Sequence, residues 1–262
     1  MRTQLDGSEV YVATGGKEYV EGQPTIMFLH GSGMDHRAFA LQTRWFAFNG
    51  FSVLAPDFPA HSLSQGEACE SIESSALWLQ KLFTRLNIHK AHVVGHSQGF
   101  LSALEFSSRF PELVSSITGI GAAWSIPVNQ MLLDTANSSP SKAADMMLKW
   151  GFGDQIHMGY SPTPGMQPIA ASHRIMSSNP LAQDLSSCAD YQNGPSAAAK
   201  LQIPSAMILA GKDKMTPLKA GLKTAEAMKS KVVILEEHGH ILPLEAPKEV
   251  LGALKEFILE LN

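Results

Sequence analysis

Residues 91–99 read Ala-His-Val-Val-Gly-His-Ser-Gln-Gly and contain the pattern G-x-S-x-G between Gly95 and Gly99. Because glycine and serine are both common, the pattern alone arises by chance in roughly one in ten chains of this length. Its surroundings make it more specific, since an apolar strand is predicted over 91–94 and a helix over 98–109. A serine on such a strand–turn–helix connection is typical of an exposed nucleophile, so Ser97 is predicted to be one.

Outward from this turn, the chain alternates predicted strands and helices. The strands are expected over 25–29, 51–55, 114–120, 205–210 and 231–235, and the helices over 38–48, 71–86, 218–228 and 247–259. This alternation predicts an α/β protein with a mostly parallel, twisted sheet that is flanked by helices on both faces.

Residues 124–200 interrupt the alternation. The segment has no clear strand pattern, is poor in charged residues and includes the proline- and glycine-rich stretch 159–168. We expect a mostly helical cap inserted over the C-terminal edge of the sheet. The predicted division is therefore a core of residues 1–123 and 201–262, with a cap of residues 124–200.

Composition excludes several classes of partner. The formal net charge of −4 leaves no basic footprint for nucleic acid. The longest apolar runs, such as 26–29 and 232–235, are strand-sized, so no membrane span is expected. Residues 1–6 lack the apolar core of a signal peptide, and two isolated cysteines, Cys69 and Cys188, favour a reducing compartment. A cytoplasmic location is the resulting expectation.

A serine nucleophile needs a general base, and in this strand–turn–helix setting the chain order is serine, acid, histidine. Of the histidines that follow Ser97, His157 and His173 lie in the insertion, before the last strands. His238 and His240 follow the last strand, and Gly239 allows a sharp turn directly before His240. His240 is the predicted base, and His238 is expected to be a loop residue.

The acid should follow a strand between the serine and the histidine. The strand over 114–120 ends in Gly-Ala-Ala-Trp and carries no acid, whereas the strand over 205–210 ends in Gly-Lys-Asp. Asp213 is therefore the predicted acid that orients His240. It could also cap the helix that begins near Pro217.

Two backbone donors are needed for the oxyanion of an acyl-transfer intermediate. The predicted donors are the N–H groups of Gln98 and Ser32, with Gly33 as the second choice in the loop after the strand 25–29. His30 in this loop, and Asp57 and His61 in the loop after the strand 51–55, are expected to bond loop backbone. The residues predicted to line the substrate pocket are Gly33, Met34, Phe100 and Trp124.

These segments together resemble the α/β-hydrolase superfamily, in its capped serine-esterase-like branch. The resemblance rests on Leu29-His-Gly-Ser-Gly33, 56–61, 95–99, Gly211-Lys-Asp-Lys-Met-Thr-Pro217 and 239–247, in the family's order. It implies the α/β-hydrolase fold with a helical lid after the sixth core strand. Two positions depart from the family pattern: Pro59-Ala-His-Ser62 stands where P-G-H-G is common, and Phe100 where many relatives have glycine.

The resulting hypothesis is a serine hydrolase that cleaves carboxylic esters of small to medium, mainly apolar substrates through an acyl-enzyme. Two alternatives stay open: a C–C bond hydrolase of β-diketone-like substrates, and a ligand-binding receptor with residual hydrolase activity. No cofactor and no metal are expected, because the chain has no P-loop, no complete dinucleotide fingerprint and no credible set of metal ligands. The expected partner is a small-molecule ester.

Overall fold

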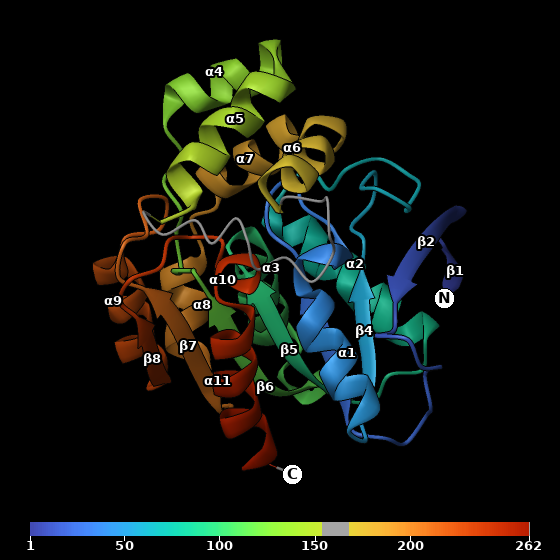
Figure 1. The fold of residues 1–262 in the computed structure, drawn as a ribbon. Helices are drawn as coiled ribbons and strands as arrows, with labels where there is room; N and C mark the ends of the chain where they lie inside the picture. Colours follow the sequence, from blue (N-terminus) through green and yellow to red (C-terminus); the bar gives the residue numbers. More distant parts are fainter. Residues whose placement is uncertain (154–167, 262) are drawn as a thin grey trace.

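The structure, a computed structural model, describes residues 1–153 and 168–261 (Figure 1). In this part of the chain one eight-stranded sheet has the strand order β1-β2-β4-β3-β5-β6-β7-β8. β2 pairs antiparallel with both β1 and β4, and the pairs along β4-β3-β5-β6-β7-β8 are all parallel. The strands are β1 (Arg2–Leu5), β2 (Ser8–Ala13), β3 (Thr25–Leu29), β4 (Ser52–Pro56), β5 (Ala91–His96), β6 (Val114–Ile120), β7 (Ser205–Ala210) and β8 (Lys231–Leu235).

Helices cover both faces of this sheet. One face carries α1 (Ala40–Phe48) and α11 (Pro247–Leu259), which lie in front in Figure 1. The other face carries α2 (Ile72–Arg85), α3 (Gln98–Arg109), α8 (Gly194–Lys200) and α9 (Leu218–Met228). The short helices are η1 (His36–Phe39), η2 (Pro111–Leu113) and α10 (Leu242–Glu245). The predicted parallel sheet with helices on both faces is confirmed.

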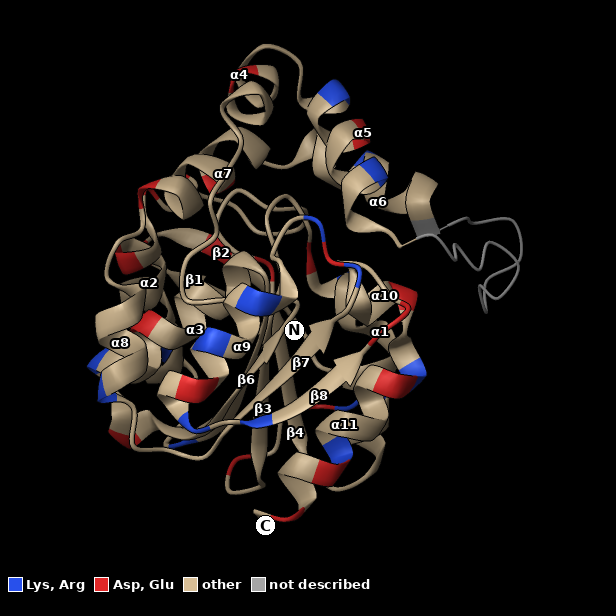
Figure 2. Ribbon diagram, turned by 90° about the vertical axis from the view of Figure 1, so that its left-hand side faces the viewer, with Lys and Arg blue, Asp and Glu red and all other residues tan. Residues whose placement is uncertain are grey.

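The central strands are buried and mainly apolar because both of their faces are covered. Ile26 and Phe28 of β3 belong to the hydrophobic core on the α1 side, and Met27 and Leu29 belong to the core on the α3 side. No residue of β3, β5, β6 or β7 is a Lys, Arg, Asp or Glu, and Figure 2 shows charged residues mainly on the surrounding helices and loops.

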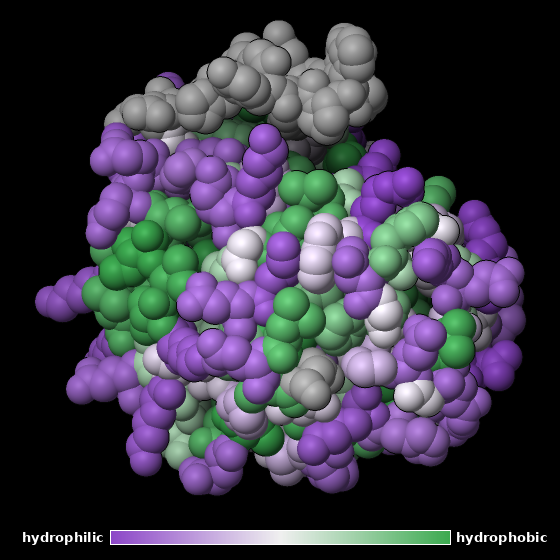
Figure 3. All heavy atoms as spheres, turned by 60° about the horizontal axis from the view of Figure 1, so that its bottom comes forward, coloured by the Kyte–Doolittle hydropathy of each residue, from purple (hydrophilic) through white to green (hydrophobic). Residues whose placement is uncertain are grey.

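β8 is an edge strand and is the least buried of the parallel strands. Its residues are exposed or half-buried, and Val232 is 40% exposed. Figure 3 views the molecule toward its lower end, where apolar residues gather on the side on which Figure 1 has β8 and α9. Polar residues cover most of the remaining surface in this view.

A helical insertion separates β6 from β7, as predicted. Its helices are α4 (Gln130–Ser138), α5 (Pro140–Gly151), α6 (Pro168–Ser178), α7 (Leu181–Asp190) and α8. α4 to α7 lie above the C-terminal edge of the sheet (Figure 1). α8 instead packs against α3 and α9, so the last part of the predicted cap joins the helical layer of the sheet. His157 and residues 159–167 of the proline- and glycine-rich stretch lie outside the described residues.

Candidate active site

The connection between β5 and α3 places Ser97 on a strained turn. Its φ of 52° lies in the left-handed region, which is uncommon for a residue with a side chain and often marks a functional site. The flanking glycines permit this turn, because a Cβ on Gly95 would lie 2.5 Å from the backbone of Gly99. A Cβ on Gly99 would lie 2.2 Å from the carbonyl oxygen of Leu29. Larger residues at either glycine would push the serine out of this position.

Ser97, Asp213 and His240 lie together, although they follow three different strands. His240 Nε2 lies 3.0 Å from Ser97 Oγ, and His240 Nδ1 lies 2.8 Å from Asp213 Oδ2. All three residues are buried. Because an ionised carboxylate can only accept, His240 Nδ1 carries a proton and Nε2 can accept the proton of the serine hydroxyl. The arrangement can therefore serve as a nucleophile, a general base and an orienting acid.

The loop that carries His240 is fixed by several hydrogen bonds. The His240 N–H donates to the Gly151 carbonyl at 2.6 Å, and His96 Nε2 lies 3.0 Å from the His240 carbonyl oxygen. Glu245 Oε1 accepts from the N–H of Gly239 at 2.9 Å. Burial raises the pKa of Glu245, and its backbone hydrogen bonds act against that shift. The histidine is thus held through its backbone as well as its ring.

Asp213 is fixed by its second carboxylate oxygen. Asp213 Oδ1 accepts from the N–H groups of Met215 at 2.8 Å and Thr216 at 2.7 Å. These groups belong to the turn before α9, whose N-cap is Pro217 and has no side-chain cap. The carboxylate therefore stabilises the turn rather than the helix itself. His238 is half-buried, and the structure brings His240 rather than His238 to the serine.

Gln98 and Ser32, whose N–H groups are the predicted oxyanion donors, both lie next to Ser97. Gln98 is the first residue of α3, so its N–H lies at a helix N-terminus, where negative charge is stabilised. Ser32 lines the same cavity as Ser97, and a Cβ on the preceding Gly31 would lie 3.2 Å from Ser97 Cβ. The N–H of Gly33, the second choice, instead donates to a cap carboxylate at 2.7 Å.

His30 holds two loops together beneath this site. Its Nδ1 donates to the Gly31 carbonyl at 3.0 Å, and its Nε2 accepts from the Phe58 N–H at 3.1 Å. This pattern needs only one ring proton. Burial, followed by the charge of His61, lowers the pKa of His30 to about 4, so the ring is neutral near pH 7.

The loop after β4 combines backbone bonding with unusual backbone angles. Asp57 accepts from the N–H groups of His36 at 2.9 Å and Leu63 at 3.2 Å, which fits the loop-fixing role expected for it. Ala60 has a φ of 64° and Ser62 a φ of 46°, in the left-handed region that glycine adopts without strain. These are the two positions where the family pattern has glycine, so the loop conformation persists although both residues carry a side chain.

A cavity of about 380 Å³ has Ser97 in its wall. Much of its lining comes from the insertion and from the segment that leads into it. The lining is mainly apolar and consists of Ser32, Ser97, Ile126, Pro127, Val128, Asn129, Leu132, Met147, Trp150, Leu185, Cys188, Lys214 and Met215. A mainly apolar group of modest size fits such a space beside the serine.

The four residues predicted to line the pocket are placed elsewhere. Phe100 is fully buried in the core on the α3 side, because this position of α3 faces the sheet. Met34 is buried in the core on the α1 side, and Gly33 packs against Leu181 of the insertion. Trp124 packs against the α3-side core, with Lys223 over its ring. None of the four lines the cavity at Ser97, so this part of the prediction is corrected.

Several lining residues were missed because their signal is tertiary. Leu132, Met147 and Leu185 read as ordinary apolar positions of amphipathic helices. Their periodicity predicts one buried face but not which of those residues faces the serine. Lys214 could have been noticed from its place directly after Asp213.

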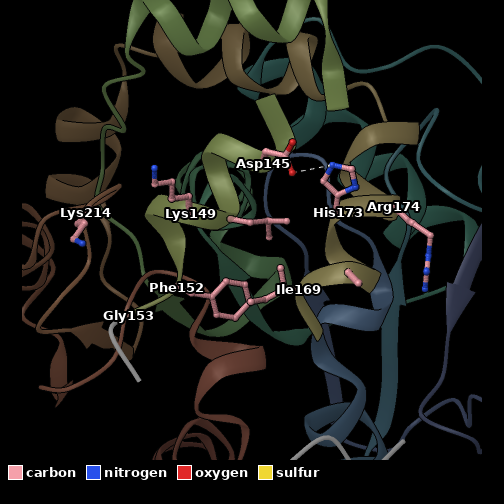
Figure 4. Close-up of a pocket in the computed structure, with 10 residues that line it drawn as sticks. Asp145, Lys149, Phe152, Gly153, Ile169, His173, Arg174 and Lys214 are labelled. Atoms are coloured by element: carbon pink, nitrogen blue, oxygen red, sulfur yellow. Dashed lines mark ion pairs between the residues drawn. The ribbon is translucent and has the colours of Figure 1, made fainter. Parts of the chain in front are cut away.

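A second hollow of about 750 Å³ is lined by residues of α5 and α6, by Phe152 and Gly153, and by Lys214 (Figure 4). An ion pair joins His173 Nε2 and Asp145 Oδ1 at 3.2 Å on its wall, and Lys149 and Lys214 lie on another side. Lys214 also lines the cavity at Ser97, so the two spaces share this residue. Ser97 itself does not line the second hollow.

One group of potential metal ligands occurs within residues 1–153 and 168–261, and it consists of Asp35, His36 and Asp57. The Asp35 carboxylate forms an ion pair with Arg37, and Asp57 is bonded to loop backbone, so both acids already have partners. Among the described helices, none is both long and apolar enough to cross a membrane.

Comparison with known families identifies the class of protein. A profile of the alpha/beta hydrolase family matches residues 26–253. The chain therefore belongs to the alpha/beta hydrolase family. Among curated proteins, protein ABHD8 of Mus musculus is 23% identical over 243 residues, which cover 89% of this chain and 55% of that protein. The chain thus spans about half the length of this relative.

Solved structures show the same fold over nearly the whole chain. The enol-lactonase from Burkholderia xenovorans LB400 superposes with a TM-score of 0.87 at 19% identity, and the match covers 99% of this chain and 100% of that one. A thermophilic esterase superposes with a TM-score of 0.81 at 24% identity, with 100% and 98% covered. Identities this low establish a shared fold, and the activity has to be argued from the site.

Proposed function

We propose that this protein is a serine hydrolase that cleaves carboxylic esters of small to medium, mainly apolar substrates. The observation that carries the proposal is the chain of contacts from Ser97 Oγ to His240 Nε2, at 3.0 Å, and from His240 Nδ1 to Asp213 Oδ2, at 2.8 Å. An unaided serine hydroxyl is a weak nucleophile near neutral pH, and this geometry supplies the base that it needs.

In the proposed reaction Ser97 Oγ attacks the ester carbonyl carbon while its proton passes to His240 Nε2. The resulting oxyanion accepts hydrogen bonds from the N–H groups of Ser32 and Gln98. The tetrahedral intermediate then collapses, and the alcohol leaves with the proton from His240 Nε2. Water hydrolyses the acyl-enzyme by the reverse use of the same groups, which releases the carboxylic acid and restores Ser97.

The cavity supports the substrate class. Its volume of about 380 Å³ is at the lower end of ordinary ligand pockets, which favours a short or medium acyl or alcohol group. Leu132, Met147 and Leu185 make this space apolar, and these residues come from the predicted cap of residues 124–200. We assign the cap the selection of the substrate and the core the chemistry.

The proposal is tested with a panel of p-nitrophenyl esters from acetate to decanoate, together with a lactone and an aryl β-diketone. Wild-type protein should hydrolyse the shorter esters, and Ser97→Ala should be slower by about 10⁴-fold or more. A fluorophosphonate should add one covalent group at Ser97, located by peptide mass spectrometry. Ester turnover that survives in Ser97→Ala would refute the proposal, and cleavage of the β-diketone alone would reassign the enzyme to C–C bonds.

A further inference from the structure

A carboxylate from the insertion reaches the loop beside Ser97. Asp184 on α7 is buried, and its Oδ2 accepts from the Gly33 N–H at 2.7 Å. The same oxygen lies 2.9 Å from His61 Nε2, and Oδ1 accepts from Gln98 Nε2 at 3.3 Å. Gly33 directly follows one proposed oxyanion donor, and Gln98 is the other. A single cap side chain thus contacts both halves of the proposed oxyanion site.

The charge of Asp184 is balanced by His61. His61 Nδ1 faces the Pro59 carbonyl oxygen at 2.9 Å, and Nε2 faces the carboxylate. Both partners are acceptors, so both ring nitrogens must carry protons, and His61 is an imidazolium. Burial lowers the pKa of His61, but the charge and hydrogen bond of Asp184 outweigh it and raise the pKa overall, with a smaller contribution from Asp57. The other ring beside it, His30, is neutral.

Asn179, just before α7, contacts the same loop. Its Nδ2 donates to the carbonyl oxygens of Gly33 at 2.9 Å and Met34 at 2.8 Å, and its Oδ1 accepts from the Ser62 N–H at 2.9 Å. The N–H and the C=O of Gly33 are therefore both bonded to side chains of the insertion.

The local packing leaves this loop little freedom. Gly33 has a φ of +67°, and a Cβ there would lie 2.9 Å from Leu181 Cδ1. Cys188, one turn after Asp184 on α7, has its Sγ 3.7 Å from Ser32 Oγ. Residues 31–34 are here called the oxyanion loop. The insertion holds this loop through hydrogen bonds with Asn179 and Asp184 and through the packing of Leu181 and Cys188.

We propose that Asp184 is a positioning residue supplied by the cap, which holds the oxyanion loop and Gln98 in the geometry that stabilises the oxyanion at Ser97. The inference rests on the proposed hydrolase function, because it concerns the donors of that reaction. Removing one oxyanion donor costs about 10²–10³-fold in turnover, and a displacement of about 1 Å costs about 10²-fold. A carboxylate that bonds to the residue after Ser32 and to the side chain of Gln98 is therefore expected to affect the rate strongly without touching the substrate.

The test is Asp184→Asn, with Asp190→Asn as the matched control at the exposed end of the same helix. We expect Asp184→Asn to lower kcat by about 10²-fold with a KM within about threefold of wild type, because the ground-state ester does not need the oxyanion site. Affinity for a trifluoromethyl ketone, which forms an oxyanion on Ser97, should fall by a similar factor. Asp190→Asn should match wild type in all three measurements.

The outcomes separate this inference from the proposed function. If Ser97→Ala loses activity but Asp184→Asn keeps wild-type kcat and ketone affinity, the positioning role is refuted and the hydrolase stands. If Ser97→Ala stays active, the hydrolase proposal fails first. Should Asp184→Asn not fold, Gln98→Met removes one of the three contacts and should lower kcat and ketone affinity by about tenfold. Unchanged values in Gln98→Met would then refute the positioning role.

Discussion

Two buried histidine–aspartate pairs occur near Ser97. His240 Nδ1 is 2.8 Å from Asp213 Oδ2, and His61 Nε2 is 2.9 Å from Asp184 Oδ2. The two pairs differ in what the second ring nitrogen faces. For His240 it faces a hydroxyl, which can donate, whereas for His61 it faces the Pro59 carbonyl, which can only accept.

This difference decides what each pair can do. A ring that faces a hydroxyl can stay neutral and take a proton, so His240 is suited to be a base. A ring that faces two acceptors has to be charged, so His61 is suited to hold a buried carboxylate in place. Proximity of histidine and aspartate therefore does not by itself mark a catalytic pair, because the third partner determines the protonation state of the ring.

The largest loss of activity is expected on substitution of His240, and almost none on substitution of His238. His240→Ala should lower kcat/KM for a p-nitrophenyl ester by roughly 10⁶-fold, because a triad without its base loses nearly all of its advantage. His238→Ala, two residues away, should stay within about threefold of wild type. Equal losses in the two variants would remove His240 from the role of base.

The second prediction compares the two acids by the same substitution. Asp213→Asn should lower kcat by about 10⁴-fold, since an amide can donate to His240 Nδ1 and so favour the wrong tautomer. Asp184→Asn should cost only about 10²-fold, because it acts on the oxyanion loop and not on the base. Steady-state kinetics on one ester measure both. A loss in Asp184→Asn as large as in Asp213→Asn would contradict the division of roles.

A smaller effect is expected in the apolar wall of the cavity. Leu132→Phe adds volume inside the space beside Ser97, so it should shift the ratio of kcat/KM for butyrate over octanoate esters by about tenfold toward the shorter chain. Met131→Phe, on the exposed face of α4, is the matched control and should leave the ratio unchanged. No shift in Leu132→Phe would show that the acyl group binds elsewhere.

The smallest expected effect is the pH dependence of stability from the His61–Asp184 pair. The pKa of His61 is raised above 6.5, so its contribution is complete below pH 6.5 and is lost as the pH rises through the raised pKa. The charge of His61 lowers the pKa of Asp184 below 3.8 against the effect of burial, so its contribution is lost only as the pH falls through that lowered pKa.

Thermal unfolding measured from pH 5 to pH 9 tests this pH dependence of the contribution of His61 to stability. The difference in Tm between wild type and His61→Gln should shrink as the pH rises through the raised pKa of His61, and in a domain of this size each 1 kcal/mol of that contribution corresponds to a Tm shift of about 2–4 °C. His89→Gln, at an exposed position, is the control. A difference that is constant over this range would mean that His61 is not charged in the folded protein.

The core of the fold and the proposed triad could be predicted from local patterns. The strand and helix periods gave the elements of the sheet within one or two residues at most ends, because both faces of the central strands are buried and read as apolar runs. The choice of Ser97, Asp213 and His240 used only chain order and strand ends, which the parallel sheet places at one edge. The structure places His240 within hydrogen-bond distance of both Ser97 and Asp213.

Chain order and strand ends say nothing about contacts across the cap. Phe100 was predicted to line the pocket because it directly follows the turn 95–99 that carries Ser97. The direction of α3 instead places Phe100 in the core. No local pattern singles out Asp184, yet it bonds to Gly33, which lies 151 positions earlier in the chain. Periodicity determines which face of a helix is buried, and only the packing of the insertion on the sheet decides what that face meets.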